Sequence, residues 1–110
     1  MKIAVVAITR HGIALAGKVA AALPGAQLFA PEKFRAEAEA ASSTAACYAG
    51  KTGDQIPALF EAFDGIVAVV SLGAVVRLIA PHLKSKDVDP AVVVLDEGGK
   101  FAIPILSGHL

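Results

Sequence analysis

Short apolar runs alternate along the chain with stretches whose apolar residues follow helical spacing. Residues 2–8 form a run rich in Val and Ile, and residues 66–70 and Ala91–Leu95 repeat the pattern. Runs of this length without polar alternation are typical of strands buried on both faces. Two shorter runs, at residues 26–30 and 101–106, predict further strands.

Helices are predicted between these strands, where apolar residues recur every three or four positions. The spacing predicts helices over residues 13–23, 54–63 and 72–83. Asp54 is the expected N-cap of the second helix. The expected apolar face of the third helix consists of Leu72, Val75, Val76, Ile79 and Leu83.

Residues 31–55 interrupt this alternation and are expected to form a variable excursion. Ala, Glu and Ser dominate this segment, and large apolar residues are few. Residues 36–46 fit either a solvated helix or a mobile loop, and the sequence leaves this choice open.

The last two predicted strands are separated by turn-forming residues, Asp96-Glu97-Gly98-Gly99. So short a connection predicts an antiparallel hairpin. Pro104 places the last strand at a sheet edge, where a missing backbone donor is tolerated.

Alternating buried strands and amphipathic helices predict an α/β fold. We expect residues 1–110 to form a single domain: a three-layer sandwich with a mostly parallel, flavodoxin-like sheet and a C-terminal β-hairpin. Ligands of such sheets bind outside the carboxyl ends of the strands, where the strand order reverses. Residues 9–12 and 71–73 are predicted to flank that crevice.

Composition narrows the possible partners. The chain has 110 residues, of which 55% are hydrophobic, and ten basic residues balance ten acidic ones. This composition excludes disorder and the strongly basic face of a nucleic-acid-binding domain. Its apolar stretches are too short or too interrupted for an export signal or a membrane span, so we expect a cytoplasmic protein without nucleic-acid or membrane partners. One cysteine and three dispersed histidines argue against a metal site.

Residues 71–77 combine a strand end, a small turn and a helix start, which is a potential anion site. Ser71 and Gly73 would offer backbone amides, and Arg77 would clamp a carboxylate or phosphate. The structural alternative is close packing at Gly73 and a solvated charge at Arg77.

Two further groups of polar residues are candidates for chemistry. Thr9, Arg10, His11 and Gly12 follow the first strand, although an exposed turn explains them equally well. Ser107 and His109 lie two positions apart, and no third partner is identifiable.

Several segments, in a specific order, carry a resemblance to a known family. They are residues 63–67, 71–81, 86–101 and 107–110, with a looser match at residues 7–12. Together they resemble the amino-terminal domain of the CbiG family of cobalt-precorrin-5A hydrolases, which act in cobalamin (vitamin B12) biosynthesis. Residues 31–55 contribute nothing to this likeness.

The resemblance implies a hydrolase that opens the δ-lactone of a cobalt-containing corrin precursor and releases acetaldehyde. It implies no cofactor, because the substrate carries the cobalt. The catalytic candidates are His11, His109 and Ser107. The candidates for binding the carboxylate-rich substrate are Thr9, Arg10, Gly12, Ser71, Gly73 and Arg77.

The resemblance also implies a partner, since family members continue past the Ser107-Gly108-His109-Leu110 segment into a carboxy-terminal domain. We expect a CbiG-like carboxy-terminal domain in cis or in trans. Three roles remain open: a domain of the hydrolase, a non-catalytic tetrapyrrole-binding module, or a docking domain of a larger cobalamin-biosynthesis protein, such as one fused to a methyltransferase. A hairpin would put Ser107 and His109 at the sheet edge opposite Thr9 and Ser71.

Overall fold

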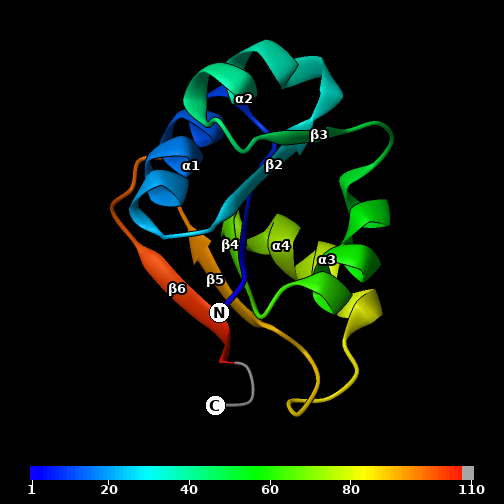
Figure 1. The fold of residues 1–110 in the computed structure, drawn as a ribbon. Coiled ribbons are helices and arrows are strands. Elements are labelled where there is room, and N and C mark those ends of the chain that lie inside the picture. Colours follow the sequence, from blue (N-terminus) through cyan, green and yellow to red (C-terminus); the bar gives the residue numbers. More distant parts are fainter. Residues whose placement is uncertain (108–110) are drawn as a thin grey trace.

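The computed structural model describes residues 1–107, in which six strands form one sheet in the order β3-β2-β1-β4-β5-β6 (Figure 1). The strands are β1 Ile3–Ala7, β2 Gln27–Pro31, β3 Ala46–Tyr48, β4 Gly65–Val69, β5 Ala91–Leu95 and β6 Ala102–Ser107. The helices are α1 Arg10–Ala22, α2 Arg35–Ala41, α3 Ile56–Ala62 and α4 Leu72–Ile79. Short 3₁₀ turns are η1 Glu32–Phe34, η2 Thr52–Gln55 and η3 Ala80–His82. Of the strands within residues 1–107, only β5 and β6 pair antiparallel, so the predicted mostly parallel sheet with a C-terminal hairpin is confirmed.

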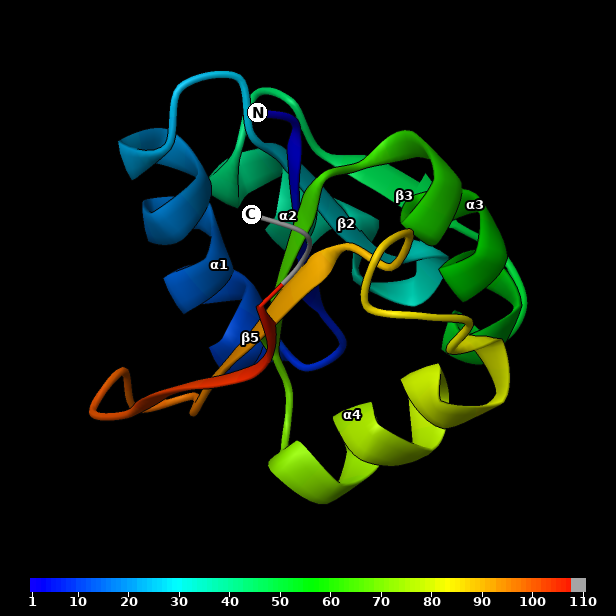
Figure 2. The ribbon, with the colours of Figure 1, turned by 90° about the horizontal axis from the view of Figure 1, so that it is seen from below.

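Helices cover the sheet on both faces (Figure 2). Ala4 and Val6 of β1 pack toward α3 and α4, whereas Val5 and Ala7 pack toward α1 and α2. Because both faces are buried, alternate positions have no reason to be polar, and the strand is apolar throughout. The predicted three-layer sandwich is confirmed.

The strand order reverses at β1, which pairs with β2 on one side and β4 on the other. Ala7 lies opposite Val69 where these two strands end, so the segments that follow leave the sheet at the same edge. Gly12 lies at this junction: a Cβ there would be 3.0 Å from the Val69 carbonyl oxygen. The α1 helix therefore begins close against the end of β4, as the crevice prediction requires.

Two predicted helix starts need correction. The first helix begins at Arg10 and not at Ile13, because the Thr9 hydroxyl accepts a hydrogen bond from the Gly12 amide (3.0 Å) and caps the first turn. Asp54 is not an N-cap. It lies within η2, and its own backbone amide donates to the Lys51 carbonyl (3.1 Å).

Residues 31–55 contain regular structure. The helix alternative left open for residues 36–46 matches α2 over part of that range, and β3 adds an edge strand that the sequence did not predict. Because β3 has only three residues, all half-buried, it is too short to show a hydrophobic period in the sequence.

The predicted third helix is shorter and less buried than expected. Regular bonding ends near Ala80 because Pro81 has no amide to donate to the Arg77 carbonyl. Of the expected apolar face, Val75 and Ile79 are buried. The other members remain exposed: Leu72 (40%), Val76 (47%) and Leu83 (44%). None of the helices in residues 1–107 is long and apolar enough to cross a membrane.

Candidate functional site at the carboxyl edge of the sheet

Thr9 links three elements at the carboxyl edge of the sheet. Its hydroxyl caps α1 and also donates a hydrogen bond to the Glu97 carboxylate (2.8 Å) in the β5–β6 turn. Sequence reasoning missed Glu97 as a site residue. A signal was available, because the predicted turn at residues 96–99 follows a strand parallel to β1 and must emerge at the same edge.

The turn that carries Glu97 is held in a defined shape. Asp96 accepts a hydrogen bond from the Phe101 amide (2.6 Å), and its carbonyl accepts one from the Gly99 amide (2.9 Å). Gly99 adopts a left-handed conformation with φ of +71°, which favours glycine. The bond from Phe101 to the ionised carboxylate keeps the pKa of Asp96 below its ordinary value.

Arg10 and His11 lie in the exposed first turn of α1. Arg10 is directed toward α2, where its guanidinium forms an ion pair with Glu37 (2.9 Å) and lies 5.9 Å from the Phe34 ring centre. It thus ties α1 to α2. His11 lies two positions after Thr9, the residue that bonds to Glu97.

Ser71, Gly73 and Arg77 are brought together as predicted. Ser71 occupies the N-cap position of α4 but makes no capping side-chain bond, which leaves first-turn amides of α4 available to a ligand. The Arg77 guanidinium extends back toward the helix start, with Nη1 3.9 Å from the position that a Cβ on Gly73 would occupy. Within residues 1–107, no acidic residue pairs with Arg77. This arrangement can accept an anion.

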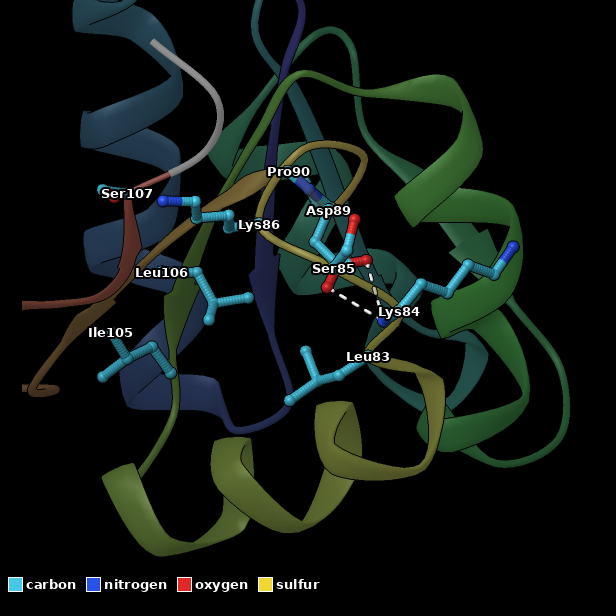
Figure 3. Close-up of a pocket in the computed structure, with 9 residues that line it drawn as sticks. All are labelled: Leu83, Lys84, Ser85, Lys86, Asp89, Pro90, Ile105, Leu106 and Ser107. Carbon is cyan, nitrogen blue, oxygen red and sulfur yellow. Dashed lines mark hydrogen bonds between the residues drawn. The ribbon is translucent and has the colours of Figure 1, made fainter.

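Ser107 lies at the opposite edge, where it pairs with Ala91 at the amino end of β5. It borders a cavity of about 290 Å³ with apolar walls from Leu83, Ile105 and Leu106 (Figure 3). Nearby, the buried Asp89 carboxylate accepts hydrogen bonds from the Lys84 amide (3.0 and 3.2 Å). The predicted separation of Ser107 from Thr9 and Ser71 is therefore confirmed. His109 lies outside the described residues.

Comparison with known proteins agrees with this fold and with the sequence motifs. Residues 54–110, slightly more than half of the chain, match the family described as "Cobalamin synthesis G N-terminal". The chain is 40% identical over 107 residues to a cobalt-precorrin-5A hydrolase from Priestia megaterium and 36% identical to one from Salmonella typhimurium. Each match covers 97% of this chain and 28% of the relative's length.

A solved structure shares the fold. It is a cobalamin biosynthesis protein G homologue from Sulfolobus solfataricus, with a TM-score of 0.66 and 22% sequence identity over 97% of this chain and 29% of that one. The family model and the identity to two hydrolases agree with the predicted resemblance. The chain therefore belongs to the Cobalamin synthesis G N-terminal family.

Proposed function

We propose that this chain is the substrate-binding amino-terminal part of a cobalt-precorrin-5A hydrolase in cobalamin biosynthesis. The observation that carries the proposal is 40% identity to such a hydrolase across 97% of the chain. Because the chain spans only 28% of that relative's length, the activity belongs to the complete protein, to which this part contributes recognition of the corrin ring and the candidate base His11.

The proposed reaction is hydrolytic. Water adds to the lactone carbonyl and the ring C–O bond breaks, which leaves a carboxylate on the macrocycle and a hydroxyl on the two-carbon fragment. That fragment leaves as acetaldehyde when its carbon–carbon bond breaks, with the electron pair and a proton passing to the macrocycle. No redox partner is needed for this balance, and the cobalt travels with the substrate.

The carboxyl edge is suited to a ring that bears acetate and propionate arms. In the proposal, the α4 amides and Arg77 bind one carboxylate arm, as a helix start and a guanidinium do for oxyanions generally. First-turn amides of α4 that the arm leaves free are the available stabiliser of the lactone oxyanion, and His11 is the available base for water at this edge.

A non-catalytic binding module is the second candidate. It is favoured by the placement of Ser107 and His11 at opposite edges of the sheet, since the candidate nucleophile Ser107 then cannot pair with that imidazole. In this version the complete chemistry lies in the remaining part of the protein, and residues 1–107 hold the ring.

One experiment separates these roles. The chain alone, and the chain mixed with the rest of the protein as a separate polypeptide, are incubated with cobalt-precorrin-5A, and acetaldehyde is measured. Acetaldehyde that forms with the wild-type chain and is lost with His11→Ala, while corrinoid binding persists, supports the hydrolase. Acetaldehyde that His11→Ala leaves unchanged, together with a saturable visible-spectrum shift of the corrinoid by the chain alone, indicates the binding module, and neither signal refutes both.

Arg77 provides the test at residue level. Because its guanidinium is exposed, solvent screens part of the 1.5–3 kcal/mol typical of a charged hydrogen bond, so Arg77→Ala should weaken corrinoid binding by roughly tenfold. Arg77→Lys should restore only part of the affinity, because the forked geometry is lost. Lys18→Ala, which removes an exposed positive charge from the middle of α1, is the matched control. Unchanged binding in both Arg77 variants would place the ring elsewhere.

We also propose the partner surface: the cavity beside Ser107 and the adjoining edge of β6 receive the remaining part of the protein. Three observations support this choice. The curated relatives are more than three times as long as the match, β6 is an edge strand, and Leu83 is 44% exposed beside Ile105 and Leu106 (Figure 3). Leu83→Glu should abolish co-elution of the two parts in size-exclusion chromatography while Lys18→Glu leaves it intact. Two strict monomers in the wild type would refute this assignment.

A further inference from the structure

A second cavity opens at the carboxyl edge of the sheet. It has a volume of about 500 Å³ and lies where β1, β2 and β3 end. Its lining includes the last residues of β2 and β3, Pro31 and Tyr48, and also Ile8, which directly follows β1. Residues 49–52 close the far side. This segment belongs to the excursion from which the sequence predicted no function.

Two hydroxyl groups in this wall form a pair. The Tyr48 hydroxyl and Thr52 Oγ1 are 2.7 Å apart, and either one can be the donor. Two hydroxyls carry two protons and the bond between them uses one, so the pair retains one proton to donate to a ligand. Burial also raises the pKa of Tyr48, which keeps its proton in place near neutral pH.

The charge around the cavity is positive. Lys33 and Lys51 line it, and no carboxylate pairs with either lysine within residues 1–107. Glu32 is the acidic residue in the lining, and it is already bound by the Arg35 guanidinium (2.7 Å), which lowers its pKa. Two lysines therefore border the cavity while its single acid is neutralised by a neighbour. The Lys33 ammonium also lies 5.2 Å from the Phe34 ring centre.

The segment that carries Lys51 is held in place before any ligand arrives. Gly50 turns the chain with φ of +79°. The Gln55 side-chain amide donates to the carbonyls of Ala49 and Lys51 (3.4 Å each), and the Asp54 amide also donates to Lys51 (3.1 Å). Such preorganisation lowers the entropy cost of ordering a loop on binding.

We propose that this cavity is a carboxylate subsite, in which Lys51, Lys33 and the Tyr48–Thr52 hydroxyl pair bind a second acidic arm of the macrocycle. The identity of the ligand rests on the proposed function. The group bound in this cavity is an oxyanion, which either a carboxylate arm of the ring or a free inorganic anion can supply. Since Ile8 lies between β1 and Thr9, the subsite adjoins the Arg77 side of the edge and suits a ring with several carboxylates.

The test compares three probes by backbone amide NMR titration: a cobalt corrinoid with free carboxylate arms, the same ring with its arms converted to amides, and inorganic phosphate. The carboxylate corrinoid should shift the amides of residues 48–52. Lys51→Gln should weaken its binding by about fivefold, since exposed lysines contribute modestly, and Tyr48→Phe should weaken it less. Lys18→Gln is the matched control, and higher salt should reduce the difference between Lys51→Gln and the wild type.

The outcomes separate this subsite from the proposed function. Weaker carboxylate-corrinoid binding in Lys51→Gln, with little effect on the amide ring, supports the subsite. Loss of binding in Arg77→Ala but not in Lys51→Gln overturns the subsite and leaves the proposed function intact. Phosphate binding that Lys51→Gln weakens, without corrinoid binding, keeps an anion site but refutes the corrin ligand. No shift at residues 48–52 with any probe overturns the inference.

Discussion

Gly17 offers the sharpest test of how the helices on one face are packed. It is buried in the middle of α1, where that helix crosses the end of α2. A Cβ at this position would lie 2.6 Å from the Ala41 carbonyl oxygen and 2.8 Å from the Ala41 Cβ. These contacts involve backbone and a side chain with no freedom to turn away, so Gly17→Ala must push the two helices apart.

The expected cost follows from two opposing terms. Overpacking costs about 1–3 kcal/mol, and a clash with backbone belongs at the upper end of that range. Alanine recovers about 1 kcal/mol of helix propensity, so Gly17→Ala should destabilise the fold by about 2 kcal/mol. For a domain of this size the melting temperature should fall by roughly 8 °C.

Thermal unfolding followed by far-UV circular dichroism measures this shift. Gly73→Ala is the matched control, because the nearest atom to its Cβ is the Arg77 guanidinium at 3.9 Å, an ordinary contact. The control should therefore unfold at or slightly above the wild-type temperature. If Gly17→Ala is as stable as the wild type, the close approach of α1 and α2 is wrong.

Three further changes test other contacts. Asp89→Ala should cost about 1.5 kcal/mol in urea unfolding because the Lys84 amide loses a charged acceptor, and Asp89→Asn should cost less. Because the pKa of Tyr48 is raised in the folded state, its stability contribution is present below about pH 10 and is lost as the pH rises through the folded-state pKa. Tyr48→Phe should therefore lose less stability at alkaline pH than the wild type. Identical pH profiles of the two proteins would contradict this expectation. The lowered pKa of Asp96 contributes stability at neutral pH that is lost on acidification below about pH 4, so the stability of Asp96→Asn should fall less there than that of the wild type.

The sequence by itself determined the central sheet. β1, β4 and β5 are short apolar runs because both of their faces are buried, and this signal is local and strong. The turn at residues 96–99 specified the hairpin, and Pro104 specified its place at the sheet edge. Together these local signals led to the strand order and hence to the edge at which Thr9 and Ser71 both lie.

The extent to which α4 is buried could not be predicted from the sequence of the helix alone. The helical spacing of Leu72, Val76 and Leu83 is the same whether or not another element covers them. A hydrophobic period thus indicates which residues share a face, whereas the neighbouring elements decide how much of that face is covered.

The partners of the site residues were decided only by the tertiary structure. Thr9 bonds to Glu97 across 88 positions of sequence, and Arg10 pairs with Glu37 instead of facing the crevice. The second cavity requires β3, a strand of three residues whose local signal is too weak to predict. Local pattern reports the average burial of each segment, but the meeting of side chains from distant segments depends on strand order and register, because these bring the ends of separate strands to one edge.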